Sequence, residues 1–273
     1  MSQSAPSADS YPSYRRLKLA MSGAVATVTL SNPEHRNAVD GVMHEEIVDV
    51  FRRLHSDGSV RVVVVTGDPE GRTFSAGGYH PWVAEKAGTG EGFEEILRVG
   101  IDLVRSIISI RQPIIGMING PAVGLGATIA LLGDISYIDE ATFISDPHVG
   151  VGVVAGDGGA AMWPLLIGPS RAKEFLMTGD RIDGARAAEM GLINHAVPAG
   201  ELESSVAAMA ERLATGPRLA IEFTKASVNL LVRQTIESVL TASIALEGLT
   251  FHTRDHREAV RAFASKETPH YDA

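Results

Sequence analysis

The sequence contains no cysteine in its 273 residues, which excludes disulfide bonds, thiolate metal ligands and a cysteine nucleophile. The absence also suits a reducing compartment, and we expect a cytoplasmic protein. No apolar run approaches the roughly 20 residues that a membrane-spanning helix needs. The formal net charge is -9, and no long block of like charges is present. These features argue against nucleic acid and against a membrane as partners.

Two further patterns are missing. No group of His, Asp and Glu has the spacing of metal ligands along the chain, so we expect no metal. The glycine-rich segments GVGVVAGDGG and GPAVGLG lack the strand–turn–helix context and downstream acid of a nucleotide-binding fingerprint. The sequence therefore predicts no separate cofactor.

The hydrophobic content of 45% is enough for one large α/β domain. Residues 1–13 are rich in Ser, Pro and Ala, and we expect a disordered N-terminus there, not a signal peptide. Residues 14–198 are predicted to form a compact core, and residues 199–273 a helical C-terminal region. The boundary is predicted at Pro198-Ala199-Gly200.

Hydrophobic periodicity predicts an irregular α/β repeat. Residues 15–30 show two alternating apolar runs broken at Ser22-Gly23, which indicates a β-hairpin. The run RVVVVT at 61–66 is typical of a strand buried on both faces, and so of a sheet covered by helices. Further strands are expected at 73–75, 114–118, 135–138 and 141–144, and helices at 41–55, 92–109, 201–214, 217–232, 235–253 and 256–266.

The segment SDPHVGVGVVAGDGG, residues 145–159, places His148 nine residues before Asp157. A carboxylate beside a histidine orients the ring and stabilises the imidazolium, which is a common general-base arrangement. An imidazole with its ordinary pKa near 6.5 suits this work at neutral pH. We therefore interpret the two residues as a catalytic pair. In the alternative interpretation, Asp157 is only the N-cap of the following helix and His148 is a structural residue.

Several motifs follow one another along the chain: HRNAVD, FSAGG, QPIIGMINGPAVGLG, the GDGG turn and RAKEFLMTGDRIDGARAAEMGLINHAVP. In this order and spacing they resemble the crotonase, or enoyl-CoA hydratase/isomerase, superfamily, from about Tyr14 to Tyr271. The resemblance implies an α/β fold with a core of repeated ββα units arranged as a spiral. It also implies a C-terminal helical trimerisation region, and assembly as a homotrimer or a dimer of trimers.

The resemblance further implies an acyl-CoA thioester as the substrate, with coenzyme A present only as part of it. The thioester carbonyl would be polarised by the backbone N–H groups of Gly78 and Leu125. The residues support this oxyanion hole, because a glycine-rich turn lets backbone approach a ligand closely, and a helix N-terminus adds positive potential.

Other candidates rest on the same resemblance. The candidates for substrate binding are Ala76, Tyr79, His80, Trp82 and Thr128. The candidates for coenzyme A binding are Arg36, Phe263 and Lys266. In the family, the basic residue at the last of these positions contacts the CoA phosphates from a neighbouring subunit.

The sequence departs from the family at the proton-transfer positions. The family's hydratases use two glutamates, and the corresponding positions here hold Thr128 and His148. A threonine hydroxyl cannot act as a general acid or base near neutral pH. Tyr79 replaces an Asp that is common after the first oxyanion turn. The family pattern is therefore kept for binding and altered for proton transfer.

Three functions are compatible with this pattern. The first is an acyl-CoA lyase or isomerase of the hydratase/isomerase type, in which Gly78 and Leu125 hold the enolate, His148 moves the proton or activates water, and Asp157 orients His148. The second is a retro-Claisen C–C bond hydrolase acting on a β-diketone or a β-ketoacyl-CoA, since such hydrolases in the superfamily have a similar His–Asp pair. The third is a non-catalytic acyl-CoA-binding scaffold, suggested by the loss of both expected glutamates.

Overall fold

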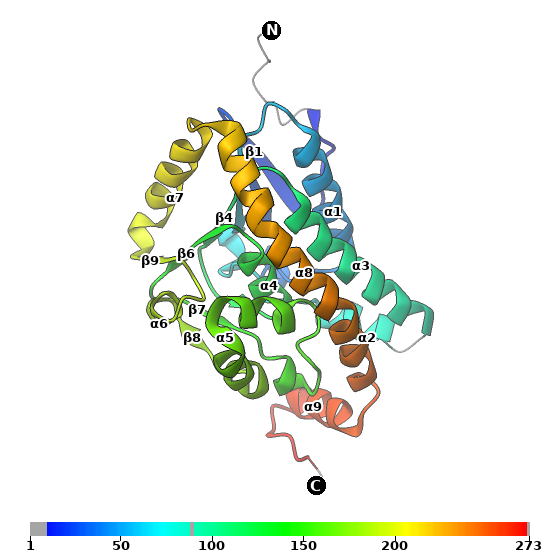
Figure 1. The fold of residues 1–273 in the computed structure, drawn as a ribbon. Helices are drawn as coiled ribbons and strands as arrows, with labels where there is room; N and C mark the ends of the chain where they lie inside the picture. Colours follow the sequence, from blue (N-terminus) through cyan, green and yellow to red (C-terminus); the bar gives the residue numbers. More distant parts are fainter. Residues whose placement is uncertain (1–9, 88–89, 272–273) are drawn as a thin grey trace.

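The computed structural model describes residues 10–87 and 90–271, which form two β-sheets surrounded by helices (Figure 1). The strands are β1 (Leu17–Ser22), β2 (Val25–Leu30), β3 (Val62–Gly67), β4 (Ile114–Ile118), β5 (Ala122–Val123), β6 (Ile135–Asp139), β7 (Phe143–Ser145), β8 (Ile182–Asp183) and β9 (His195–Val197). The helices are α1 (Gly41–Ser56), α2 (His80–Ala87), α3 (Gly90–Ser109), α4 (Leu125–Leu131), α5 (Gly159–Thr178), α6 (Gly184–Glu189), α7 (Ala199–Ala214), α8 (Arg218–Thr250) and α9 (Arg254–Ser265).

The chain repeats one step as it winds around the core. A strand joins the larger sheet, which has the order β1-β2-β3-β4-β6-β9, and the next joins the smaller sheet, β5-β7-β8. A helix then follows, as in β4–β5–α4 and β6–β7–α5. From β2 to β9 the larger sheet is parallel, so each connection must cross over before the next strand begins. This is the ββα spiral that the sequence motifs imply.

Several predicted elements are confirmed. The predicted hairpin is the antiparallel pair β1 and β2, joined at Gly23, whose φ of +55° favours glycine. Strand β3 is buried along its whole length, as its β-branched run indicated. Helix α1 begins after Asp40, whose carboxylate accepts a hydrogen bond of 2.9 Å from the Met43 N–H.

The structure differs from the predicted elements in three places. Residues 218–250 form the single helix α8, since no glycine or proline interrupts the chain where a break was predicted near residue 233. The strand predicted at 73–75 is reduced to a bridge between Ser75 and Ala122. Helix α2 forms where no helix was predicted, because its eight residues are too few to show a helical period.

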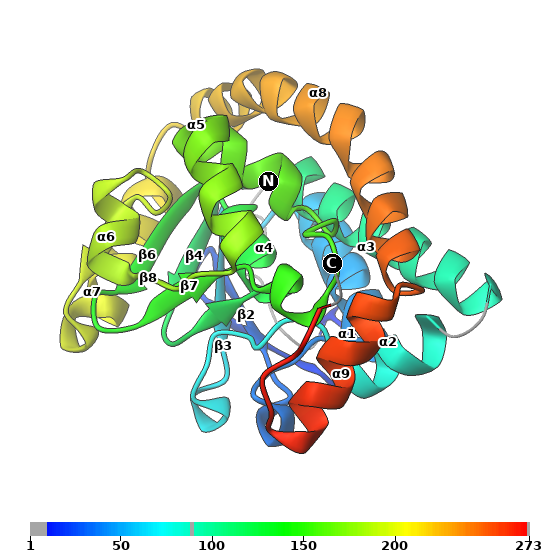
Figure 2. The same cartoon turned by 90° about the horizontal axis from the view of Figure 1, so that it is seen from below.

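The C-terminal helices cover the core in different ways. Helix α7 packs its apolar face, Leu202, Val206 and Ala210, against the larger sheet. Helix α8 runs along the outside beside α3 and α5, and its C-terminal end lies close to α2 and α9 (Figure 2). Among the described residues, no helix combines the length and apolar character required to cross a membrane. The domain boundary at residues 198–199 stays a prediction.

Part of the predicted disordered terminus, residues 1–9, lies outside the described residues. From residue 10 onward the chain lies against α1. There the hydroxyls of Tyr11 and Tyr14 donate hydrogen bonds of 2.8 Å to Asp57 and Asp49, respectively.

Candidate active site

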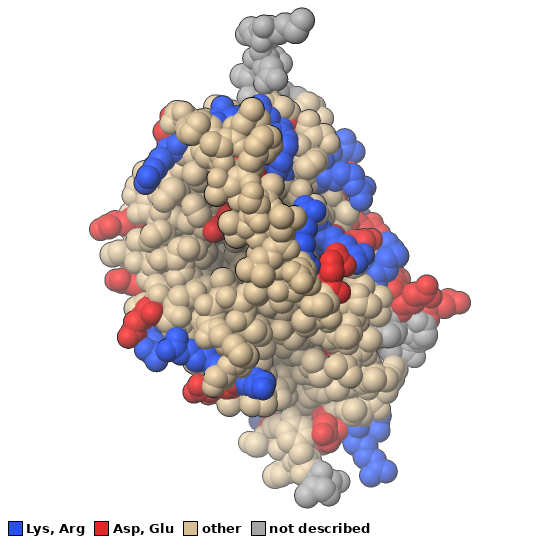
Figure 3. All heavy atoms as spheres, in the orientation of Figure 1, with Lys and Arg blue, Asp and Glu red and all other residues tan. Residues whose placement is uncertain are grey.

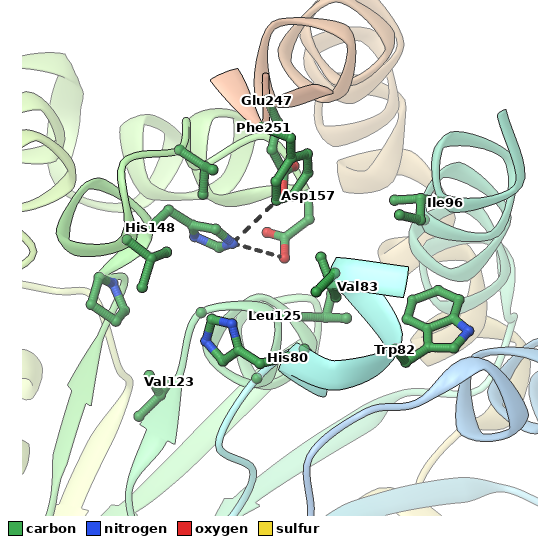
Figure 4. Close-up of a pocket in the computed structure, with 18 of the residues that line it drawn as sticks. His80, Trp82, Val83, Ile96, Val123, Leu125, His148, Asp157, Glu247 and Phe251 are labelled. Atoms are coloured by element: carbon green, nitrogen blue, oxygen red, sulfur yellow. Dashed lines mark ion pairs between the residues drawn. The ribbon is translucent and has the colours of Figure 1, made fainter. Parts of the chain in front are cut away.

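The two glycine-rich turns, the 145–159 segment and α2, α3, α8 and α9 all contribute to one pocket with a volume of about 360 Å³. Much of its wall is apolar, and His148, Asp157 and Glu247 lie together on one side of it (Figure 4). The labelled apolar side chains around them are Trp82, Val83, Ile96, Val123, Leu125 and Phe251. An apolar pocket with a few convergent polar groups is the usual form of a small-molecule site.

The two turns touch because two glycines leave room for them. The Val123 N–H donates a hydrogen bond of 3.0 Å to the Ser75 carbonyl. A Cβ added at Gly126 would lie 2.7 Å from the Cβ of Ser75, so α4 can approach the first turn only without a side chain there. Gly77 has a φ of +88°, and a Cβ added to it would lie 3.5 Å from the Leu125 nitrogen. The residues before Gly78 and the start of α4 are therefore neighbours.

The backbone N–H groups of Gly78 and Leu125 both lie at this junction and line the pocket. Among the described residues, neither N–H donates a hydrogen bond to a protein acceptor. Leu125 is the first residue of α4, so its N–H is one of the free donors at a helix N-terminus, where the helix dipole adds positive potential. The pair can therefore receive a ligand oxygen. Their role as an oxyanion hole stays a prediction.

His148 is held by Asp146, a residue that the sequence analysis overlooked. The Nδ1–H of His148 donates to Oδ1 of Asp146, whose side chain is completely buried. The other oxygen of Asp146, Oδ2, has no hydrogen-bond partner among the described residues, and a Cβ added at Gly159 would lie 2.2 Å from it. The imidazole itself lies against Gly124, where a Cβ would be 3.4 Å from His148 Cε1. The sequence could have indicated this contact, because Asp146 stands two residues before His148 in the same motif.

Asp157 faces the opposite nitrogen of His148. Its Oδ2 lies 3.4 Å from His148 Nε2, and its Oδ1 accepts a hydrogen bond of 3.3 Å from Thr128 Oγ1. Within the described chain, α5 begins after Gly158 without a side-chain cap, so the interpretation of Asp157 as an N-cap is wrong. The structure therefore brings His148 and Asp157, the predicted pair, together. An orienting carboxylate usually contacts Nδ1, however, and here that contact is made by Asp146.

Glu247 brings a further carboxyl group to the same place. It projects from α8, and its Oε1 lies 3.9 Å from His148 Nε2, with 10% of its side chain exposed (Figure 4). The sequence offered no signal for this residue, because a single glutamate in a long helix is usually a solvated surface charge. Only the path of α8 across the core directs it into the pocket.

The three carboxyl groups control the protonation of the site. Burial lowers the pKa of His148, but the charges of Asp146 and Asp157 outweigh burial and raise it well above its usual value. The expectation of an ordinary pKa near 6.5 is therefore wrong. Burial raises the pKa of Glu247 to about 8, with repulsion from Asp157 and Asp146 adding to burial and attraction to His148 opposing it. At neutral pH the site accordingly holds an imidazolium at His148 and a largely neutral glutamic acid at Glu247.

Donor atoms of Asp146, His148 and Asp157 lie within 4.8 Å of one another, close enough for a metal ion. Their separations along the chain did not indicate this cluster. Each imidazole nitrogen, however, faces a different carboxylate, so an ion bound at Nε2 would meet Asp157 and not the Asp146 oxygen held by Nδ1. The prediction that the site needs no metal stays a prediction.

The other predicted residues divide into two groups. Ala76, His80 and Trp82 line the pocket, and the pKa of His80 is lowered by burial and by the nearby His148 and His256. Tyr79 and Thr128 are not among the described lining residues. The Tyr79 ring instead lies 4.6 Å from the ring of His35, and Thr128 is buried behind Asp157.

The candidates for coenzyme A binding lie elsewhere. Arg36 and Lys266 are exposed, outside the described lining of the pocket. The side chain of Phe263 lies outside what the structure describes. Coenzyme A binding by these residues stays a prediction.

Comparisons with known proteins agree with this architecture. The family model described as enoyl-CoA hydratase/isomerase matches residues 20–273. A probable enoyl-CoA hydratase of Rhodobacter capsulatus is 30% identical over 95% of this chain and 98% of its own length. A crotonyl-CoA hydratase of Syntrophomonas wolfei is 28% identical over 93% of this chain and 96% of its own. The crystal structure of an enoyl-CoA hydratase/isomerase from Mycobacterium paratuberculosis superimposes with a TM-score of 0.86 at 35% identity, covering 92% of this chain and 99% of the other. The chain therefore belongs to the enoyl-CoA hydratase/isomerase, or crotonase, family of enzymes.

Proposed function

We propose that this protein is an acyl-CoA enzyme of the hydratase/isomerase type that stabilises a thioester enolate. The observation that carries the proposal is the pair of unpaired N–H groups, Gly78 and Leu125, in the same pocket as His148. Donors placed where an oxyanion develops lower the barrier, and losing one such donor costs about 3–4 kcal/mol in comparable sites. The names of the relatives, several of them hydratases of CoA thioesters, support the substrate class.

The protonation states support a division of the proton transfers. Hydration needs one group that takes a proton from water and another that gives a proton to the α-carbon. Burial raises the pKa of Glu247 to about 8, so Glu247 is the group that still holds a proton near neutral pH. We assign the proton-accepting role to Asp157, the other carboxyl group beside His148 Nε2. In our proposal, the water oxygen bonds to the β-carbon while its proton passes to Asp157. The α-carbon of the enolate then takes a proton from Glu247.

In this mechanism, His148 returns Asp157 and Glu247 to their starting protonation states. Its Nε2 lies 3.4 Å from Asp157 and 3.9 Å from Glu247, so the imidazolium can give its Nε2 proton to Glu247 and then take the proton from Asp157. Asp146 acts as the positioning residue, because it holds the ring by Nδ1 and balances the imidazolium charge. His148 thus remains the proton-moving group, and the orienting role passes from Asp157 to Asp146.

The test is hydration of crotonyl-CoA, followed by loss of the enoyl chromophore. We expect turnover by the native protein, and with His148→Ala a loss of turnover with thioester binding retained. His55→Ala, a change on the outer end of α1, is the control and should behave as native protein. An unchanged rate with His148→Ala contradicts the mechanism. Thioester binding without turnover in the native protein would instead identify the non-catalytic scaffold.

The second candidate is the retro-Claisen hydrolase. The contact between His148 Nδ1 and Asp146 favours it, because a ring oriented in this way can take a proton from water through Nε2 once the imidazolium has lost its own Nε2 proton. That water would attack a second carbonyl, and the carbon–carbon bond would break to release the enolate to Gly78 and Leu125. Loss of the diketone chromophore of a cyclic β-diketone tests this reaction. Efficient crotonyl-CoA hydration together with an inert diketone would exclude it.

We also propose that the chain assembles as a homotrimer or a dimer of trimers. Leu219, Phe223 and Leu230 are 60–72% exposed and recur on one side of α8, which suits burial against another copy. Figure 3 shows a broad area without charged side chains in the middle of this face, with Lys, Arg, Asp and Glu toward its edges. Phe223→Glu should lower the mass measured by sedimentation equilibrium, and an unchanged mass would contradict the use of this surface.

Two proposals concern the compartment in which the protein acts and the cofactors that it needs. We propose that the protein acts in the cytoplasm and needs no cofactor beyond the coenzyme A of its substrate. Turnover that survives prolonged dialysis against a chelator would support a metal-free reaction, and recovery only on adding a divalent metal would contradict it.

A further inference from the structure

His44 is a polar residue in the pocket wall that the proposed mechanism does not use. Its side chain is 5% exposed and lines the same pocket as Gly78. The start of α1 is tied to the first oxyanion turn, since the Val39 N–H donates to the Gly77 carbonyl at 2.8 Å and the Tyr79 N–H donates to the Val39 carbonyl at 2.9 Å. His44 therefore lies about one helical turn, roughly 5.4 Å along α1, beyond the residues that adjoin Gly78.

The hydrogen bonding of His44 determines its tautomer. Nδ1 lies 2.9 Å from the backbone carbonyl oxygen of Asp40, and a carbonyl can only accept, so Nδ1 carries the proton. Burial lowers the pKa of His44, which keeps the ring neutral at physiological pH. Nε2 is consequently an acceptor without a proton.

No hydrogen bond to His44 Nε2 is present among the described residues. The Trp82 ring lies 5.2 Å from the His44 ring between centroids, and the charge of Asp157, which lines the same pocket, also acts on His44. A ligand that covers Nε2 without donating to it would leave this acceptor unpaired, so a bound molecule that donates to Nε2 gains affinity over one that does not.

We propose that His44 Nε2 accepts a hydrogen bond from a hydroxyl group on the acyl chain, and that the preferred substrates are hydroxylated short-chain acyl-CoA thioesters. This inference rests on the proposed function, which places the thioester carbonyl at Gly78 and Leu125. Because about one helical turn of α1 separates His44 from the residues beside Gly78, we place this hydroxyl on the fourth or fifth carbon of the acyl chain. A keto oxygen or a carboxylate there would meet another acceptor, so His44 selects against both.

The test is equilibrium binding of saturated thioesters, which does not depend on turnover. Calorimetry compares 4-hydroxybutyryl-CoA with butyryl-CoA, and 5-hydroxyvaleryl-CoA with valeryl-CoA. For the native protein we expect at least one hydroxylated thioester to bind about tenfold or more tightly than its parent, because sites built to bond a hydroxyl discriminate strongly. His44→Phe, which keeps a ring beside Trp82, should abolish that preference while leaving the affinity for the parent thioesters within about twofold.

Two further variants separate recognition from structure. His44→Gln retains an acceptor oxygen and should recover part of the preference. His55→Phe, on the same helix outside the pocket, should keep all of it. Equal binding of each pair by the native protein, or an equal loss of both ligands in His44→Phe, would overturn the inference while leaving the proposed function intact. If none of the four thioesters binds, the proposed function itself fails.

Discussion

Oε1 of Glu247 lies 3.9 Å from Nε2 of His148, although the two residues belong to α8 and to the segment after β7. Glu247 thus joins Asp157 as a carboxyl group in the pocket wall, in a site where the resemblance predicted that Thr128 and His148 replace two glutamates. Acidic groups are therefore present, but they reach the pocket from different elements. The predictions below test what that rearrangement does.

Glu247→Gln removes the proton that we assign to the α-carbon. A neutral amide cannot transfer a proton, so kcat should fall by about 10²–10⁴-fold. In the native protein, kcat/KM should fall as pH rises through an apparent pKa of about 8, because Glu247 then loses its proton. The variant should lack that alkaline limb in its pH profile. Glu237→Gln, an exposed change on the same helix, is the control, and an unaltered limb in Glu247→Gln would assign it to another group.

The same residue makes the stability of the protein depend on pH. The folded protein keeps the Glu247 proton up to about pH 8, whereas an unfolded chain loses it near the ordinary value of 4.5. The free energy of unfolding should therefore fall as pH rises between these values. His148 acts in the same direction, because its pKa is raised and its contribution is lost as pH rises above 6.5. Urea unfolding from pH 5 to 8 should show a fall on the order of 1 kcal/mol or more in native protein, and a clearly smaller one in Glu247→Gln. Parallel profiles would contradict the assignment.

Asp146→Asn tests the orientation of His148. The amide cannot balance the imidazolium, and the equivalent change in a serine-protease triad costs about 10⁴-fold in kcat. We expect a loss of about 10²–10⁴-fold in kcat/KM, with thioester affinity retained. The pKa of His148, measured by NMR titration, should fall, because burial lowers it and one opposing negative charge is gone. Asp183→Asn, at the N-cap of α6, is the matched control. A normal rate would show that Asp146 does not position the catalytic ring.

Gly126→Ala tests the contact between the two glycine-rich turns that hold Gly78 and Leu125. The added methyl would lie 2.6 Å from the Ser75 carbonyl oxygen, so α4 must shift and move the Leu125 N–H. Overpacking of this kind costs about 1–3 kcal/mol of stability. We expect that loss in thermal unfolding together with a fall in kcat of about tenfold or more. Gly200→Ala is the control, since a Cβ there meets nothing within 4 Å. A full kcat in Gly126→Ala would mean that the spacing of the turns is not needed.

Local sequence determined the elements and part of the site. The β-branched run of β3, the Asp40 cap of α1 and the glycine turns around Gly78 and Leu125 depend on residues close together in the chain, so their patterns were sufficient. The same holds for His148 and Asp157, although the nearer partner Asp146 was overlooked. The contact between His148 and Glu247 of α8 could not be predicted, because a sequence pattern shows which residues are present and not which of them face each other.

The tertiary structure decided the rest. The course of α8 brings Glu247 into the pocket, and the bridge between Val39 and Gly78 brings His44 beside the predicted oxyanion hole. Both residues lie on helices, where their sequence neighbours indicate only an amphipathic face. Their protonation depends on burial and on charges from distant parts of the chain, which arise only when the spiral closes. The sequence by itself therefore determined the fold and the presence of His148 and Asp157 in one motif, whereas packing decided the contact with Glu247 and the pKa shifts of His148 and Glu247.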